Sequence, residues 1–356
     1  MKKKKSITVF IVAAILCLFL IDSCSDKENP VTPPDEPYQY DSARYNWKVD
    51  TLYGQGFYAG LWAKDTNDIF ITNIFNNRLY RIQNGIKSFI QYPPDTYLGV
   101  VTGDELNNGY IVALKLIDSL YQPVFQKFDG NTFVEIPNPQ NLEKNFFFNA
   151  VFIKNENEMW IGSDGYENGF IVKFDGTNLT SYILEDSRTK TLKFFYDESN
   201  KFKLLASIHH LDTDKTEFVI YEFTGSQWIK IFSDLNSMRP LKYNILNKYV
   251  SAVNEYSIFE LVDSSLIPRI ALNSIGSNFS MGGYSFNNII FPSPIRIQNR
   301  VSSLFHWNGE KWSLELSGYF TDPLTEVFMI NENFYYVVSY DQNARTYLMQ
   351  GRKKLF

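Results

Sequence analysis

A near-constant interval between turn dipeptides is the feature of this sequence that most constrains its fold. Each dipeptide follows a run in which apolar and polar residues alternate. The dipeptides are Asn84-Gly85, Asp129-Gly130, Asp175-Gly176, Thr224-Gly225, Asn308-Gly309 and Gln350-Gly351. Asn-Gly and Asp-Gly pairs favour positive φ angles and close tight hairpins. Successive intervals are 45, 46, 49, 84 and 42 residues, and Asp263-Ser264 lies near the middle of the long one. The chain is therefore predicted to consist of repeats of about 44 residues.

Each repeat is predicted to contain four short strands and no helix. Alternation of apolar residues predicts strands at 58–63, 68–72, 78–83 and 87–92 in the first repeat, and at 149–154, 158–162, 169–174 and 179–184 in the third. Such units are typical of the blades of a β-propeller. Large side chains flank the turns and are expected to stack between neighbouring blades. Those before the turns are Phe128, Phe174, Phe223 and Trp307, and those after them are Phe133, Leu179, Trp228 and Trp312.

The last repeat lacks a fourth strand, because only five residues follow Gly351. Residues 46–52 alternate in the same way as the fourth strands of other repeats. We therefore predict that 46–52 pair with 345–350 and complete the final blade, which removes the open edge. The predicted fold is all-β: a seven-bladed β-propeller of four-stranded antiparallel blades, with the last blade closed by the N-terminal strand. Aromatic residues make up 17% of the chain, which suits pleated sheets.

The first residues have the composition of an export signal. Lys2 to Lys5 precede an apolar stretch of 15 residues, Ile7 to Ile21, which is short of the ~20 residues that span a bilayer. The sequence Ile21-Asp22-Ser23-Cys24 resembles the lipobox of bacterial lipoproteins. This resemblance implies that residues 1–23 are a lipoprotein signal peptide and that Cys24 is lipidated. The alternatives are an ordinary cleaved signal with an incidental cysteine, and a single uncleaved anchor.

The remaining chain is expected to be a tether, 24–45, followed by a propeller domain, 46–356. The tether contains four prolines and few aliphatic residues, as in semi-extended linkers. Removal of 1–23 leaves 30 Lys and Arg against 38 Asp and Glu, a net charge of −8. This balance argues against nucleic acid as a partner. The expected location is the bacterial outer membrane, on its periplasmic or cell-surface side, with a monomer attached to the membrane through its N-terminal lipid.

The blades resemble those of secreted bacterial β-propellers, including two-component-regulator sensor propellers and the sialidase-like group. The resemblance is carried by Gly60-Leu61-Trp62-Ala63-Lys64-Asp65-Thr66-Asn67-Asp68-Ile69-Phe70-Ile71, by Phe174-Asp175-Gly176 and by His306-Trp307-Asn308-Gly309. It implies a propeller in an extracytoplasmic setting. The Ser-x-Asp-x-Gly-x-x-Trp box of sialidases is missing, so no catalytic residue is carried over from that group.

Histidine and acidic residues form no pattern typical of a catalytic or metal site. Neighbouring residues on a strand point to opposite faces, so His209 and His210 are not expected to bind one metal together, and Asp212 completes no metal-ligand spacing. His306 lies beside a turn and is expected to be a packed residue. Apart from Cys24, the mature chain has no cysteine, and it has no Gly-x-Ser-x-Gly elbow or nucleotide-binding loop. No catalytic residue, metal or cofactor is therefore predicted.

Candidate ligand-binding residues lie in the connections between strands. In propellers resembling this one, the connections between second and third strands and between successive blades share one end of the domain, where ligands usually bind. Side chains of this kind that suit binding are Tyr166, His209, His210, Asp212 and Arg296. Phe146, Phe147 and Phe148 also lie outside the repeated packing positions.

The sequence leaves three functions open. The main prediction is a lipid-anchored, non-catalytic binding module for a protein or glycan of the cell envelope. The alternative is an envelope glycan-processing enzyme of sialidase-like architecture, which would need two carboxylates roughly 5–10 Å apart. The third is a sensory or assembly module that binds a single protein.

Overall fold

The computed structural model describes most of the chain from residue 43 onward. The described residues are 43–52, 58–74, 76–104, 106–137, 147–164, 168–197, 199–213, 215–234, 243–246, 249–252, 257–262, 265–271, 282–285, 287–293, 303–317, 326–340 and 346–354. Within these ranges every regular element is a β-strand. The predicted signal peptide, Cys24 and the tether up to residue 42 lie outside them.

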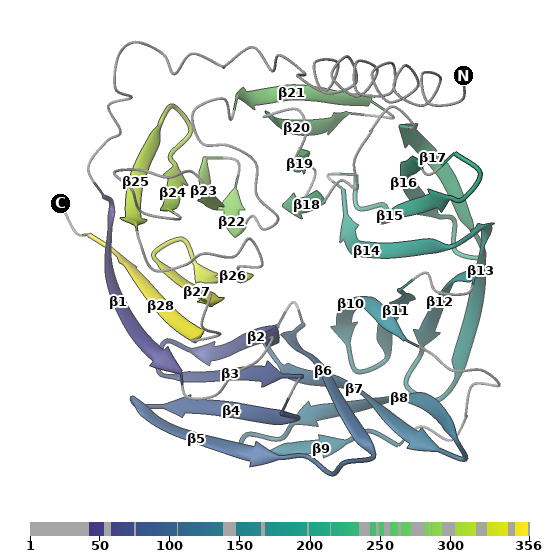
Figure 1. Ribbon diagram of the computed structural model, residues 1–356, viewed down its shortest axis with the longest axis horizontal. Coiled ribbons are helices and arrows are strands. Elements are labelled where there is room, and N and C mark those ends of the chain that lie inside the picture. The colour runs from purple at the N-terminus through teal and green to yellow at the C-terminus, as the bar shows by residue number, and fades with distance from the viewer. Residues whose placement is uncertain are drawn as a thin grey trace, which may run out of the picture. The chain divides into compact units, whose positions relative to one another are not determined.

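The strands form seven four-stranded sheets, each of which we call a blade (Figure 1). Blade one contains β2 (Tyr58–Asp65), β3 (Asp68–Asn73), β4 (Arg78–Gln83) and β5 (Ile86–Gln91). Blade two contains β6 (Thr96–Gly103), β7 (Gly109–Ile117), β8 (Leu120–Phe128) and β9 (Phe133–Glu135). Blade three contains β10 (Phe148–Asn155), β11 (Glu158–Ser163), β12 (Asn168–Phe174) and β13 (Leu179–Ser187). Blades four and five contain β14 (Thr189–Tyr196), β15 (Phe202–His210), β16 (Lys215–Phe223) and β17 (Trp228–Asp234); and β18 (Tyr243–Leu246), β19 (Tyr249–Ala252), β20 (Ser257–Val262) and β21 (Ser265–Ala271). Blades six and seven contain β22 (Gly282–Ser285), β23 (Asn288–Ser293), β24 (Ser303–Trp307) and β25 (Trp312–Ser317); and β26 (Glu326–Asn331), β27 (Phe334–Tyr340), β28 (Thr346–Lys353) and β1 (Tyr45–Leu52).

The blades follow one another in a closed series. The first strand of each blade contacts the first strand of the next, from β2 and β6 through to β22 and β26, and β26 contacts β2. All pairings within the blades are antiparallel, with the four strands in sequence order in blades one to six. The predicted fold, a seven-bladed propeller of four-stranded antiparallel blades, is confirmed.

The N-terminal strand closes the last blade, as predicted. β1 pairs with β28 along its whole length, from Tyr45 opposite Lys353 to Leu52 opposite Thr346. The predicted turn at Gln350-Gly351 is wrong, because Gly351 lies within β28. A Cβ atom on Gly351 would lie 2.6 Å from Cη2 of Trp47. The glycine is therefore required by the tryptophan that crosses it from β1, and not by a turn.

Glu315 of β25 fastens β1 to the neighbouring blade six. Its carboxylate is buried and accepts hydrogen bonds from the backbone N–H groups of Arg44 (2.8 Å) and Tyr45 (3.0 Å). The same carboxylate accepts bonds from the Trp47 indole (3.3 Å) and the Ser313 hydroxyl (2.7 Å). The backbone N–H groups of Arg44 and Tyr45, at the start of β1, thus find their hydrogen-bond acceptor in blade six. We call this set of contacts the closing latch.

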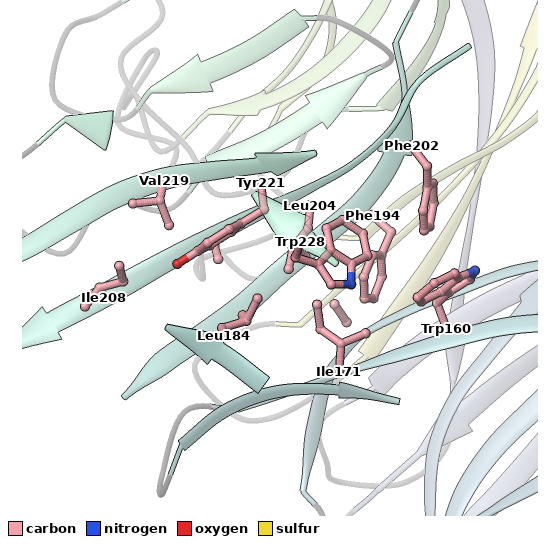
Figure 2. Close-up of a cluster of buried hydrophobic side chains, with 12 residues drawn as sticks. Trp160, Ile171, Leu184, Phe194, Phe202, Leu204, Ile208, Val219, Tyr221 and Trp228 are labelled. Atoms are coloured by element: carbon pink, nitrogen blue, oxygen red, sulfur yellow. The ribbon is translucent and has the colours of Figure 1, made fainter. Parts of the chain in front are cut away.

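Aromatic side chains fill the interfaces between blades. Trp160 and Trp228 belong to the buried cluster between blades three and four (Figure 2). The ring centroid of Trp160 lies 5.6 Å from that of Trp228 and 4.8 Å from that of Phe223. Phe223 and Trp228 are paired across the β16–β17 hairpin, on either side of Gly225. Similar contacts join blades one and two through Trp62, Phe128 and Phe133. At these two interfaces, the stacking predicted for the residues that flank the turns is confirmed.

The order of strands gives the propeller two unlike faces. The hairpin face carries the turns between first and second strands and between third and fourth strands. Glycines at 85, 130, 176, 225 and 309 have φ between 81° and 106° there, so five of the predicted turns are confirmed. The connection face carries the turns between second and third strands and the links from one blade to the next. His306, near the hairpin face, is buried, and its Nε2 donates a 2.7 Å hydrogen bond to Oδ1 of Asn288.

Candidate functional site

Large apolar side chains that remain exposed in the described part of the chain fall into two main groups. One group lies on the outer, fourth strands of the blades: Ile86, Phe89, Ile90, Val134, Ile183, Ile229 and Ile267. The other lies on the connection face: Ile74, Tyr97, Leu116, Phe147 and Leu211. Scattered apolar residues on outer strands are ordinary surface features. Side chains that gather at one junction are a stronger indication of a binding surface.

Three aromatic rings meet at the junction of blades two and three on the connection face. Tyr97 is the second residue of β6, Tyr121 is the second residue of β8, and Phe147 directly precedes β10. The rings of Tyr97 and Tyr121 lie 5.3 Å apart at 81°, and those of Tyr121 and Phe147 lie 5.2 Å apart at 51°. Leu116 is paired with Tyr121 across the β7–β8 hairpin and extends the apolar surface. We call Tyr97, Leu116, Tyr121 and Phe147 the aromatic cluster.

Hydrogen bonds hold the backbone around Tyr97. Asn77, in the β3–β4 turn, donates from its side-chain amide to the carbonyl oxygens of Thr96 and Pro93 (2.8 Å for Pro93). Its side-chain oxygen accepts the N–H of Leu98 at 2.9 Å. The residues on both sides of Tyr97 are therefore fixed to blade one. Because this backbone is already held in place, Tyr97 would lose less conformational entropy on binding a ligand.

The β7–β8 turn is equally compact. Its central residues, Asp118 and Ser119, have φ angles of 50° and 68°. Two successive positive φ angles are typical of a type I′ turn, whose twist matches that of the flanking strands. The N–H of Leu116 donates to the carbonyl of Asp95 at 2.7 Å, which joins this hairpin to the link between blades one and two. The aromatic cluster is thus exposed but rigidly supported.

Three of the residues predicted from sequence lie together on the connection face of blade four. His209 and His210 end β15, and Asp212 lies in the following turn. His209 and Asp212 are exposed, whereas His210 forms a 2.8 Å contact with Glu217. Their arrangement agrees with the expected location, and their role in binding stays a prediction.

Glu217 is the centre of a small polar network beside these residues. It is buried, accepts a hydrogen bond from Ser233, contacts His210, and lies 3.5 Å from Lys230. Burial alone would raise the pKa of Glu217, but the bonds from Ser233 and His210 and the charge of Lys230 outweigh it, so the pKa lies below its ordinary value. His210 is therefore engaged in holding blade four together, and His209 and Asp212 are the more accessible members of the predicted set.

The other predicted ligand-binding residues, Tyr166 and Arg296, lie outside the described residues, as do Phe146 and the predicted lipidation site Cys24. Of the aromatic cluster, only Phe147 was singled out by its sequence. Tyr97 and Tyr121 occupy strand positions that look like any other alternating aromatic residue. Their position could have identified them, since both lie near the start of a strand, at its end on the connection face.

The first strands of the blades, which contact one another, carry few acidic residues. The described sequences of these seven strands contain two, Asp65 and Glu326. Asp65 ends β2 at the hairpin face and Glu326 opens β26 at the connection face, and strands of this length span roughly 20 Å. Among the described residues, no group of three His, Cys, Asp or Glu side chains is placed to hold a metal ion. No helix in the described ranges has the length and hydrophobicity to cross a membrane.

Comparison with known proteins supports the fold. No protein-family model matches the sequence. A search of curated proteins gives no significant match. Among solved structures, YCF48 bound to D1 peptide is similar with a TM-score of 0.61 and 11% identity, over 89% of this chain and 100% of that one. Virginiamycin B lyase from Staphylococcus aureus has a TM-score of 0.63 and 9% identity, over 87% and 100%. The extracellular domain of the putative hybrid two component system BT4673 from B. thetaiotaomicron has a TM-score of 0.51 and 11% identity, over 86% of this chain and 42% of that one. At these identities the likeness establishes the β-propeller fold.

Proposed function

We propose that this protein is a lipid-anchored β-propeller of the bacterial cell envelope that binds a protein or glycan through its connection face without transforming it. The anchor is Cys24, and the location is the outer membrane, on its periplasmic or cell-surface side. The proposal combines the export signal and lipobox-like sequence with a rigid scaffold that exposes rings on one face. Structurally similar propellers include one bound to a peptide, which agrees with a binding role.

The aromatic cluster is the observation that carries the binding function. Tyr97 and Phe147 are 49% and 44% exposed although both lie beside well-packed blade interfaces. Aromatic residues supply large contact areas at a low cost in conformational entropy and dominate binding energies where they are rigidly presented. Apolar side chains that gather on an exposed surface are typical of interaction sites.

The arrangement of acidic residues favours binding over glycan hydrolysis. A glycosidase requires two carboxylates at a separation of roughly 5–10 Å. The two acidic residues on the first strands, Asp65 and Glu326, lie at opposite ends of equivalent strands. The exposed Asp65 also accepts the N–H of Asn67 at 2.7 Å and so shapes the β2–β3 turn. The exposed side chains that meet at the junction of blades two and three are aromatic.

The binding function can be tested by capture from an envelope extract. The detergent-solubilised mature protein is immobilised and incubated with solubilised outer membranes and with isolated envelope glycans. Phe147→Ala should reduce the captured ligand at least tenfold. Phe89→Ala is the matched control, because Phe89 is 52% exposed on the outer strand of blade one and should leave capture unchanged. Equal loss in both variants, or loss in neither, would contradict the proposal.

The anchor is tested separately by cell fractionation. The wild-type protein should sediment with the outer membrane on a density gradient. Cys24→Ser should release it into the soluble fraction, because the thiol that carries the lipid is removed. A Cys24→Ser variant that stays in the membrane fraction would refute lipid anchoring at this residue.

A further inference from the structure

We propose that two copies of this protein associate through the outer edges of their first blades, with β5 of one copy paired antiparallel to β5 of the other. The inference goes beyond the proposed binding function, because it concerns the rim of the propeller and not the connection face. It replaces the monomer expected from the sequence by an equilibrium between monomer and dimer. Three observations carry it: the exposure of β5, the protection of the other outer strands, and the self-complementary sequence of β5.

β5 presents a continuous apolar edge to solvent. It is the last strand of blade one and lies at the rim of the propeller (Figure 1). All six of its residues are exposed, with Ile86 at 73%, Phe89 at 52% and Ile90 at 44%. Three of the seven large apolar side chains exposed on outer strands therefore gather on this one strand, and the other four are spread over four blades. Such a gathering differs from the scattered apolar residues of an ordinary surface.

The other outer strands carry features that discourage pairing with another chain. β9 has only three residues. The pairings of β13, β17, β21 and β25 with their neighbours contain irregularities of register, and β21 also contains Pro268. β1 carries the charged residues Lys48 and Asp50. β5, in contrast, pairs with β4 in unbroken register along all six residues. Among the described outer strands, β5 is the one that combines length, regularity and an apolar sequence.

The single charge of β5 is directed away from the open edge. The ammonium of Lys87 donates a hydrogen bond to the carbonyl of Thr51 in β1 at 2.8 Å, which holds it against blade seven. On the same side of the sheet, the ring centroid of Phe89 lies 4.4 Å from the Arg78 guanidinium carbon and 6.0 Å from the ring centroid of Tyr80. Lys87 therefore does not protect the edge, and the Phe89 ring is already held in place for a contact.

Half of the backbone polar groups of β5 are directed outward. The Asn84-Gly85 turn, with φ angles of 50° and 81°, is a two-residue hairpin whose flanking residues form a hydrogen-bonded pair. At the other end of the strand, the N–H of Tyr92 donates to the carbonyl of Asn77 at 3.0 Å, in the same phase. The even-numbered residues thus bond to β4, and the N–H and C=O groups of Phe89, in the middle of the odd-numbered set, point outward. Another extended strand satisfies such groups.

The sequence of β5 complements itself when two copies run antiparallel about a twofold axis at Ser88. Ile86 of each copy then lies opposite the partner's Ile90, on the side of the sheet away from Lys87. On the other side, Phe89 lies opposite the aliphatic stem of the partner's Lys87, whose carbonyl accepts the N–H of Phe89. An axis at Phe89 would instead place Ile90 opposite the partner's Ser88 and separate the isoleucines. The register centred on Ser88 is therefore the favoured one.

One unprotected edge per chain limits the assembly to a dimer. The contact uses the same surface on both copies, so neither β5 remains available for a third chain. Six residues on each side are fewer than the roughly 20–30 of a standard interface, so we expect a Kd in the micromolar range.

Sedimentation equilibrium of the complete mature chain with Cys24→Ser, which cannot carry a lipid, measures this association. Ile86→Lys and Ile90→Glu should each raise the dimer Kd about tenfold or more, because each places a charge opposite an isoleucine. An equimolar mixture of the two variants should dimerise again, since the opposite charges then face each other across the twofold axis. Ile183→Lys is the matched control, because Ile183 is 81% exposed on the outer strand of blade three and should leave Kd unchanged. Circular dichroism controls for folding.

Cysteine cross-linking tests the register. In the proposed dimer the two Ser88 Cα atoms form a non-hydrogen-bonded pair about 4.5 Å apart, within the range of a disulfide. The two Phe89 Cα atoms lie about 8 Å apart, beyond that range, because the pair is offset by two residues along the strands. In the same Cys24→Ser chain, mild oxidation should link Ser88→Cys into a covalent dimer and leave Phe89→Cys unlinked.

Four results overturn the proposal: a chain that stays monomeric at its highest soluble concentration, a mixture of Ile86→Lys and Ile90→Glu that associates no better than either alone, the reverse cross-linking pattern, and a dimer that forms only after residues 25–42 are removed. If the chain is monomeric but Ile90→Glu loses an envelope protein, β5 binds a different partner and the proposal is wrong. Capture of the envelope ligand through the connection face should be the same in Ile86→Lys, Ile90→Glu and wild type. Failure of the dimer therefore leaves the binding function standing, and failure of capture leaves the dimer standing.

Discussion

Removing the Glu315 carboxylate should open the propeller at its closing latch. In Glu315→Ala, the N–H groups of Arg44 and Tyr45 and the indole of Trp47 lose their acceptor at once. Each unsatisfied buried donor costs about 1–3 kcal/mol, so we expect a loss of about 3–5 kcal/mol in the free energy of unfolding. The Ser313 hydroxyl contributes less, because it also lies 3.3 Å from the carbonyl of His306. Glu315→Gln keeps one carbonyl acceptor and should cost about 1–2 kcal/mol.

Urea unfolding of the mature protein measures this loss. With a slope of about 3 kcal/mol per molar urea or more for a domain of this size, Glu315→Ala should lower the midpoint by about 1 M. Hydrogen exchange localises the effect: the amides of β1 and the paired amides of β28 should lose protection before those of blades two to four. Glu310→Ala is the matched control, since Glu310 is an exposed acid in the β24–β25 turn of the same blade.

Two results would refute the reasoning. An unchanged midpoint in Glu315→Ala would show that the donors at the start of β1 find water or another acceptor at no cost. A loss of protection spread evenly over all blades would show that Glu315 stabilises the propeller as a whole and not the closure of the ring.

Two further predictions concern the hairpin face and pH. Gly130→Ala should cost about 1–2 kcal/mol, because its φ of 106° is strained for alanine although nothing lies within 4 Å of the added Cβ. Gly176→Ala should lower the free energy of unfolding further, since its Cβ would lie 2.3 Å from Asn157 Oδ1. Adding Asn157→Ala should reduce this loss to that of Gly130→Ala. Equal losses in Gly130→Ala and Gly176→Ala would contradict this explanation. Burial and the charges of Arg44 and Lys353 lower the pKa of His306 from 6.5 to about 3. As the pH falls, the unfolded chain therefore binds this proton before the folded chain does. The free energy of unfolding should fall by roughly 1.4 kcal/mol per pH unit between about pH 6.5 and pH 3. The pH dependence of the urea midpoint should flatten between pH 6.5 and 5 in His306→Gln, and an unchanged slope would show that His306 is not the responsible group.

The fold could be predicted from the sequence because its determinants are local and repeated. The strand predicted at 78–83 coincides with β4, since alternation and an adjacent Asn-Gly turn fix both of its ends. Four other blades present the same kind of turn, with glycines at 130, 176, 225 and 309, so an error in one repeat is corrected by the next. The pairing of 46–52 with the last blade followed from the missing fourth strand and from the alternation of apolar residues in 46–52.

Gly351 shows where this reasoning fails. It matched the interval of the repeat, but its role depends on Trp47, which is about 300 positions away in the sequence and adjacent in space. The aromatic cluster was missed for the same reason. Phe147 is exposed, while Phe148 packs over Gly99, where an added Cβ would lie 2.2 Å from its ring. Two consecutive phenylalanines thus lie in different environments, and this difference depends on the contact between blades two and three.

The start of the propeller domain and the aromatic cluster lie on opposite faces. β1 begins at Tyr45, opposite Lys353, whose N–H donates to the carbonyl of Asn333 in the β26–β27 turn. That turn joins a first strand to a second, so the chain enters the domain at the hairpin face. The aromatic cluster lies at the other ends of the strands, on the connection face. The proposed binding surface is therefore separated from the start of the domain by the full length of the strands.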